Sequence, residues 1–201
     1  MHKGIATVCL SGTLEDKLNA AAAAGFSGVE IFENDLIASA WSPEQVREHC
    51  DRLGLSIDLY QPFRDFDSAD PGTARRTLRR AERKFDVMRR LGTDTMLVCS
   101  SVSADAVDDD EPLAEQLRAL AERAAEHGMH IAYEALAWGR VVDTWERSWE
   151  VVRRADHPAL GLCLDSFHVL SRAQSGGTST DGIAQIPADK LFFLQLADAP
   201  L

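Results

Sequence analysis

This sequence has no long apolar run and no targeting segment. A membrane-spanning helix needs about 18 consecutive apolar residues, and no stretch of the chain reaches that length. The opening residues lead straight into a strand-like run and lack the apolar region of a signal peptide. We therefore expect a cytoplasmic protein that has no membrane partner.

Basic residues are scarce. The chain has 21 Lys and Arg against 32 Asp and Glu, a formal net charge of −11, and no basic run. A surface of this charge repels phosphate backbones, so we expect no nucleic-acid partner. The acidity by itself is typical of an ordinary solvated surface.

Several reactive motifs are also missing. The sequence has no G-x-S-x-G, no Walker A motif and no G-x-G-x-x-G. None of its four lysines stands at the expected carboxyl end of a strand, so a Schiff-base mechanism has no nucleophile. There is no C-x-x-C, and Cys9, Cys99 and Cys163 lie in strand-like runs, where cysteine is usually a small buried hydrophobe. Zinc and disulfide roles are therefore disfavoured, and metal-assisted enolisation remains.

What the sequence does contain is a unit of about thirty residues, in which a short apolar run precedes a segment of helical periodicity. The expected strands are Gly4–Leu10, Gly28–Phe32, Ser56–Gln61, Thr95–Ser100, His130–Ala135, Leu160–Asp165 and Leu191–Ala197. The expected helices are Leu14–Ala24, Pro43–Leu53, Ala74–Leu91, Pro112–His127, Thr144–Arg154 and one that begins near Phe167. Such alternation indicates a parallel sheet.

The number of strands favours a barrel over a doubly wound sheet. The segment Ser11-Gly12-Thr13 is too short for the Gly-rich phosphate turn of a doubly wound fold. We therefore expect an α/β protein with a (β/α)8 TIM barrel, C-terminally truncated, in which residues 1–201 form a single domain lacking the last β/α unit. An unclosed barrel has open edges, which indicates a fragment of a longer polypeptide or completion by a partner chain.

Three oxygen-bearing side chains end successive expected strands. Glu134, Asp165 and Gln195 each follow an apolar run at the carboxyl end of a strand, where barrel enzymes place their reacting groups. Two adjacent carboxylates repel one another unless a proton or a cation intervenes. A hard divalent metal, Mg²⁺ or Mn²⁺, would resolve this repulsion, with the amide oxygen of Gln195 as a third ligand. The alternative is that these residues are separate helix caps or salt-bridge partners.

His168 is the best-placed general acid or base. It lies three residues after Asp165, one helical turn further along, and its ordinary pKa is near neutrality. The remaining histidines fall on helices, in a loop or at the opposite end of a strand. The alternative reading of His168 is a surface or capping histidine.

Candidates for substrate binding lie near the ends of the third and fifth strands. Arg64 follows Gln61 closely and could hold a substrate carboxylate by two parallel hydrogen bonds; a salt bridge to Asp65 or Asp67 is an equal alternative. Gln61 itself ends its strand and is a second candidate. Arg140, shortly after Glu134, is a weaker one.

Longer motifs carry a family resemblance. They are Gly25-Phe26-Ser27-Gly28-Val29-Glu30, Ile31-Phe32-Glu33-Asn34-Asp35, Tyr60-Gln61-Pro62-Phe63-Arg64-Asp65-Phe66, Ala81-Glu82-Arg83-Lys84-Phe85-Asp86, Tyr133-Glu134-Ala135-Leu136-Ala137-Trp138-Gly139-Arg140 and Leu164-Asp165-Ser166-Phe167-His168. With them the sequence resembles the bacterial 3-dehydroshikimate dehydratases of the xylose isomerase-like barrel superfamily, from the first strand to the last residue.

The resemblance implies a metal-dependent hydro-lyase that converts 3-dehydroshikimate to protocatechuate. It implies a divalent cation (Mg²⁺, Mn²⁺ or Co²⁺) held by Glu, Asp, Gln and a final Glu, of which the first three match Glu134, Asp165 and Gln195. The final Glu belongs beyond Leu201. Family members can carry a dioxygenase-like domain after the barrel.

Other functions stay open at this point. A sugar or sugar-phosphate isomerase or epimerase uses the same kind of metal on the same barrel. A barrel fragment without catalysis could serve as an interaction module. A DNA-repair endonuclease on a related barrel is disfavoured by the negative charge. The sequence leaves the oligomeric state open, a homo-oligomer included.

Overall fold

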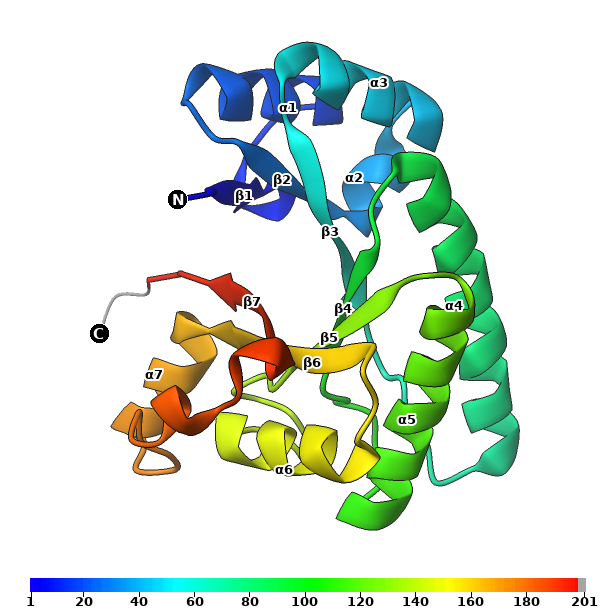
Figure 1. Cartoon of the computed structure of the whole chain (residues 1–201), viewed down its shortest axis with the longest axis vertical. Coiled ribbons are helices and arrows are strands. Elements are labelled where there is room, and N and C mark those ends of the chain that lie inside the picture. Colours follow the sequence, from blue (N-terminus) through cyan, green and yellow to red (C-terminus); the bar gives the residue numbers. More distant parts are fainter. Residues whose placement is uncertain (199–201) are drawn as a thin grey trace. The chain divides into compact units, whose positions relative to one another are not determined.

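A computed structural model describes residues 1–198 of the chain, which form two compact units. The first unit comprises residues 1–62 and 83–96, and the second comprises residues 63–82 and 97 onward. Each contains strands with helices packed against them, drawn in sequence colours in Figure 1.

The strands of both units are parallel neighbours in chain order. They are β1 (Gly4–Ala6), β2 (Gly28–Phe32), β3 (Ser56–Phe63), β4 (Thr95–Cys99), β5 (His130–Glu134), β6 (Leu160–Asp165) and β7 (Leu191–Gln195). In the first unit β1 pairs with β2 and β2 with β3, and in the second β5 pairs with β6 and β6 with β7, all parallel. Seven parallel strands were predicted, and this prediction is confirmed.

Helices alternate with the strands along the chain. They are α1 (Leu14–Ala23), α2 (Glu33–Ala38), α3 (Pro43–Leu53), α4 (Pro71–Leu91), α5 (Asp110–Glu126), α6 (Trp145–Ala155) and α7 (Ser166–Gln174). Short 3₁₀ turns lie at Thr7–Cys9, Ile183–Gln185 and Ala188–Lys190. Within residues 1–198, no helix combines the length and the apolar character that crossing a membrane requires.

Helix α3 shows how local sequence sets these boundaries. The Ser42 hydroxyl accepts a hydrogen bond from the backbone N–H of Gln45, whose side chain accepts one from the Ser42 N–H, so the two form a capping box. Pro43 occupies the first helical turn, where its missing N–H costs nothing. Gly54 ends the helix in the left-handed conformation at φ 71°. The bounds match those expected from the sequence.

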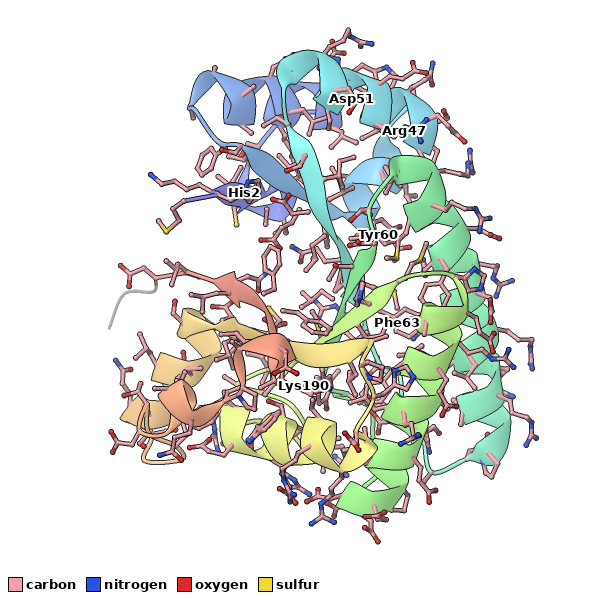
Figure 2. The ribbon with its side chains drawn as sticks, viewed as in Figure 1. His2, Arg47, Asp51, Tyr60, Phe63 and Lys190 are labelled. Atoms are coloured by element: carbon pink, nitrogen blue, oxygen red, sulfur yellow. The ribbon has the colours of Figure 1, made fainter. Side chains whose placement is uncertain are left out.

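In the second unit, α5 and α6 pack against each other and against β5 and β6. Leu117, Ile131 and Val151 are completely buried there. At the base of β6, the Lys190 ammonium (labelled in Figure 2) donates to the carbonyl oxygens of His157 at 2.8 Å and Leu160 at 3.3 Å. This packing fixes the carboxyl ends of β5 and β6 with respect to each other.

Two expectations about the first strand were wrong. It ends at Ala6, because the chain turns into a 3₁₀ turn in which the buried Thr7 hydroxyl accepts a hydrogen bond from the Phe32 N–H at 3.0 Å. Cys9 consequently lies exposed in this turn, not buried in a strand. Cys99 and Cys163 are buried as predicted.

Other strand ends shifted by one or two residues. The third strand continues through Phe63, which is buried, and the last ends at Gln195 instead of 197. The sequence analysis also missed α2, which directly follows β2 without a connecting loop and has no side-chain cap. Its polar start, Glu33-Asn34-Asp35, looks like a loop in the sequence.

Candidate active site

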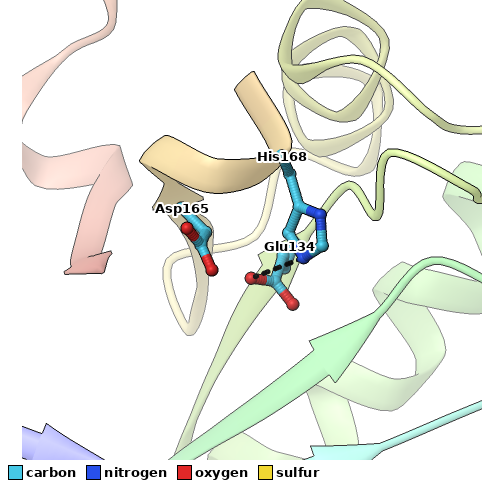
Figure 3. Close-up of side chains that lie close together, drawn as sticks. All are labelled: Glu134, Asp165 and His168. Atoms are coloured by element: carbon cyan, nitrogen blue, oxygen red, sulfur yellow. Dashed lines mark ion pairs between the residues drawn. The ribbon is translucent and has the colours of Figure 1, made fainter. Parts of the chain in front are cut away.

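Three ionisable side chains converge in the second unit. Glu134 is the last residue of β5, Asp165 is the last residue of β6, and His168 lies in the first turn of α7. One ligand atom from each lies within 4.8 Å of the other two (Figure 3). The sequence predicted that these residues would meet, because adjacent parallel strands bring their carboxyl ends to one edge.

Glu134 lies in a nearly closed environment, with a side chain only 4% exposed. Its Oε1 lies 3.9 Å from Nε2 of His168, and its Oε2 accepts a hydrogen bond from the Cys99 thiol at 3.4 Å. Burial, and secondarily the Glu134 charge, raises the pKa of Cys99 well above its usual value. The thiol therefore stays protonated and remains a donor to the carboxylate.

His168 is held by the loop that follows β5. The backbone N–H of Ala137 donates to Nδ1 of His168 at 3.2 Å. The rings of Trp138 and Phe167 lie edge-on to the imidazole, with centroids at 4.8 Å and 5.3 Å. Burial lowers the pKa of His168, the Arg64 charge lowers it further, and Asp165 opposes both. The imidazole is therefore neutral at neutral pH.

Asp165 has two contacts of different kinds. Its Oδ1 accepts a hydrogen bond from the Phe167 N–H at 2.7 Å, so Asp165 is the N-cap of α7. The capping role considered from the sequence is thus confirmed. It does not exclude the shared site, because the same carboxylate lies beside Glu134 and His168.

Gln195 lies next to Asp165 in the sheet. The two residues are register partners in the β6–β7 ladder. Register partners on neighbouring strands direct their side chains to the same face of a sheet. This alignment supports Gln195 as a ligand beside Asp165, and its role as a third metal ligand stays a prediction.

The chemistry of this group suits a divalent cation. The carboxylates of Glu134 and Asp165 have oxygen atoms within 4.8 Å of each other, so both can offer a donor to one ion. Without a cation or a proton between them, the carboxylates would repel each other. The residues present therefore fit a metal ion.

Arg64 directly follows β3 and is exposed. The alternative considered for it was a salt bridge to Asp65 or Asp67. Within residues 1–198 its guanidinium makes no salt bridge with Asp65 or Asp67, because both carboxylates accept hydrogen bonds elsewhere. Asp65 accepts from the N–H groups of Val102 and Ser103 at 3.0 and 3.2 Å. The Arg64 charge lowers the pKa values of His168 and Cys99.

A second arginine holds this segment in place. Arg80 of α4 donates to the backbone carbonyls of Arg64 and Asp65, and its guanidinium carbon lies 4.3 Å from the centre of the Phe63 ring. A cation over an aromatic face is attractive, and a planar guanidinium can do this while donating sideways. Arg80 thus fixes the backbone from which the Arg64 side chain extends.

The other two substrate-binding candidates, Gln61 and Arg140, form hydrogen bonds with other residues. Gln61 belongs to the first unit, where its amide donates to Oε2 of the buried Glu30 at 2.7 Å. Arg140 is exposed in the second unit, and its backbone N–H donates to the Ser101 carbonyl at 2.9 Å. Both assignments stay predictions.

Sequence reasoning missed Cys99 and Trp138. Cys99 ends β4 in the position equivalent to Glu134 on β5, so the strand-end rule that found Glu134 could also have found it. Trp138 stands in the motif after Glu134. No pattern in the sequence indicates that the Trp138 side chain is exposed to solvent.

The fold and this group of residues agree with a match to a protein family. Residues 18–201 match the model of the xylose isomerase-like TIM barrel. The chain belongs to the xylose isomerase-like TIM barrel family. The predicted fold class is therefore confirmed, and strand ends are the expected place for reacting groups in this family's barrel.

Relatives of this barrel chain carry one activity in their names. It is 59% identical over 201 residues to a 3-dehydroshikimate dehydratase of Pseudomonas aeruginosa and 57% identical to one of Pseudomonas putida. Both alignments cover 100% of this chain and 31% of the relative, so the chain spans about a third of their length. The resemblance stated from the motifs is confirmed.

A solved structure is also similar to this chain in fold and sequence. A xylose isomerase-like TIM barrel/4-hydroxyphenylpyruvate dioxygenase fusion protein superposes with a TM-score of 0.95 at 56% identity. The match covers 100% of this chain and 32% of that protein.

Proposed function

We propose that this chain is the barrel part of a metal-dependent 3-dehydroshikimate dehydratase, a hydro-lyase that forms protocatechuate with loss of one water. The observation that carries the proposal is the convergence of Glu134, Asp165 and His168, with ligand atoms within 4.8 Å of one another. The names of the two Pseudomonas relatives support the choice of reaction.

The proposed metal ligands are Glu134, Asp165 and Gln195, and the cation is Mg²⁺, Mn²⁺ or Co²⁺. The two carboxylates and the register of Gln195 with Asp165 support this set. When bound, such a cation would act as a Lewis acid toward the ketone of the substrate and favour its enolate. Oxygen donors favour a hard cation.

The protein's own groups then orient the substrate and move protons. Arg64 would bind the substrate carboxylate with two parallel hydrogen bonds, which its lack of a salt-bridge partner within residues 1–198 supports. His168, neutral because of its burial, would transfer the proton next to the ketone. Loss of the β-hydroxyl as water followed by tautomerisation gives the aromatic ring.

The proposal extends to the whole protein. We infer that the two units belong to a single barrel domain, and that a dioxygenase-like domain follows it, as in the fusion protein that this chain resembles. Gln61 and Arg140 are retained as further substrate-binding residues. The location proposed for the protein is the cytoplasm.

The test is direct. The whole protein, freed of metal with a chelator and then supplied with Mn²⁺, is incubated with 3-dehydroshikimate while the absorbance of protocatechuate is followed. The proposal requires turnover with Mn²⁺ and its loss with chelator. No aromatic product from the metal-loaded wild-type protein would refute it, and isomerisation of a ketose instead would favour the sugar isomerase alternative.

A further inference from the structure

A large aromatic side chain is exposed beside the proposed proton-transfer residue. Trp138 is 56% exposed, although its indole packs edge-on against His168 at 4.8 Å and lies 6.2 Å from the ring of Phe167. One side of the indole therefore supports the imidazole while much of the ring remains in contact with water. An exposed indole is costly to hydrate and is well suited to contact a ligand.

Hydrogen bonds from several backbone N–H groups hold the loop that carries Trp138. The N–H of Leu136 donates to the Ser100 hydroxyl at 3.0 Å, and the N–H of Ala137 donates to His168 at 3.2 Å. The N–H of Arg140 donates to the Ser101 carbonyl at 2.9 Å. The exposed ring is thus held by an ordered backbone.

Gly139 explains how closely this loop is packed. A Cβ at this position would lie 2.0 Å from the carbonyl oxygen of Val142 and 2.6 Å from the Ser100 hydroxyl oxygen. Only glycine allows that approach. The indole is therefore presented in a fixed place, which lowers the entropy cost of binding against it.

We propose that Trp138 is a specificity-determining residue whose exposed indole packs against the six-membered ring of a cyclic carboxylate bound at this site. The inference rests on the proposed function. An open-chain polyol offers no flat apolar face, so the indole favours ring ligands over open-chain ones.

The expected size of the effect follows from the strength of aromatic contacts. A pair of stacked or edge-on rings is worth roughly a 3- to 10-fold change in affinity. The aromatic product, protocatechuate, should gain at least as much from the indole as the partly saturated substrate does. Removing the indole should therefore weaken substrate and product binding together.

The experiment uses the whole protein with Mn²⁺ and three variants: Trp138→Ala, Trp138→Phe and, as a matched control, Trp149→Ala on the half-exposed Trp of α6. The dissociation constant of protocatechuate is measured by calorimetry, and kcat and KM are measured with 3-dehydroshikimate. Thermal midpoints show that each variant is folded.

We expect Trp138→Ala to raise both the protocatechuate dissociation constant and KM roughly 3- to 10-fold, with kcat within about twofold. Trp138→Phe should restore most of the binding, and the control should match the wild type. A fall in kcat with unchanged KM and unchanged protocatechuate affinity would overturn the proposal, since Trp138 would then act only through His168. Unchanged constants in Trp138→Ala would overturn it as well.

Failure of the proposed function gives a different result. If the wild-type protein does not dehydrate 3-dehydroshikimate, yet binds protocatechuate more tightly than Trp138→Ala does, the reaction is wrong and the indole contact stands. If the wild-type protein neither turns over the substrate nor binds protocatechuate, both are wrong.

Discussion

Two buried glutamates end up in different chemical environments, one in each unit. Glu30 of β2 is 6% exposed, and its Oε2 accepts a hydrogen bond from the Gln61 amide at 2.7 Å. Glu134 of β5 is 4% exposed, but its neighbours are a second carboxylate, Asp165, and the imidazole of His168. Burial alone therefore does not distinguish a structural carboxylate from a functional one.

The difference lies in the charge of the neighbouring groups. A buried carboxylate that accepts a hydrogen bond from an amide has part of its lost hydration replaced. A buried carboxylate beside another carboxylate also experiences the repulsion of that second charge, which a cation between the two would offset. The proposed role of Glu134 is therefore cation binding in the second unit, and the role proposed for Glu30 is the stability of the first.

Exchanging each glutamate for glutamine should separate these roles with the largest effect. Glu134→Gln should weaken Mn²⁺ binding by the whole protein about 100-fold or more and abolish turnover, because a charged ligand is lost. Glu30→Gln should keep the metal stoichiometry and lose roughly 1–3 kcal/mol of unfolding free energy, because a charge-assisted hydrogen bond is weakened. Calorimetric titration with Mn²⁺ and urea unfolding measure these. Equal loss of metal binding in both variants would refute the assignment.

Asp165 is both the N-cap of α7 and a proposed metal ligand, and two substitutions can separate these roles. Asp165→Asn keeps an oxygen that can accept from the Phe167 N–H but removes the charge, so we expect a loss of Mn²⁺ affinity of about 10- to 100-fold with little change in stability. Asp165→Ala should lose the affinity and, in addition, about 1 kcal/mol of unfolding free energy. Metal titration and thermal unfolding provide the readouts. Wild-type affinity in Asp165→Asn would show that the residue is only a cap.

Two positively charged side chains, one in each unit, also differ in their neighbours. Lys84 in the first unit forms an ion pair with Glu33, which also accepts a hydrogen bond from the Tyr60 hydroxyl at 3.1 Å. Arg64 in the second unit has no salt bridge within residues 1–198. The charge of Lys84 is paired within the protein, whereas Arg64 is the residue proposed above to bind the substrate carboxylate.

Substitutions of Arg64 and Arg80 should raise KM, by smaller factors than those expected for the Mn²⁺ affinity of the carboxylate variants. Arg64→Gln should raise KM for 3-dehydroshikimate roughly 10-fold. Arg80→Lys should raise it by about 3-fold, because a lysine has no planar group that can stack on Phe63 while donating sideways to the carbonyls. Lys84→Gln should leave KM unchanged. Steady-state kinetics on the whole protein measure this. An unchanged KM in Arg64→Gln would remove Arg64 from substrate binding.

The pH dependence is the smallest expected effect. Burial lowers the pKa of His168 below its ordinary 6.5; the Asp165 charge opposes this shift, and the Arg64 charge adds to it. The active neutral form therefore persists below pH 6.5, and the acid limb of kcat/KM should fall below that value. In the window between the folded pKa and 6.5, the unfolded chain binds more protons, so stability decreases as pH falls. An acid limb at or above pH 6.5 would contradict this.

Much of the fold could be predicted because each boundary has a local cause. The capping box at Ser42 and the left-handed glycine at Gly54 mark α3 completely. The carboxyl ends of β5 and β6 could be predicted because a single charged residue follows an all-apolar run. For the same reason, the meeting of Glu134 with Asp165 was predictable from the parallel-strand rule.

Contacts between distant residues could not be predicted in this way. The 3₁₀ turn after β1 depends on the hydrogen bond between Thr7 and Phe32, which are 25 positions apart. The Cys99 thiol on Glu134 and the Ala137 N–H on His168 depend on side-chain and loop geometry that no local pattern encodes.

The most direct test of the account locates the cation. Crystals of the whole protein soaked in Mn²⁺ are measured at a wavelength where manganese scatters anomalously. The account predicts one strong anomalous peak within about 2.0–2.3 Å of oxygens from Glu134, Asp165 and Gln195. A peak elsewhere, or one that Glu134 and Asp165 do not touch, would contradict it.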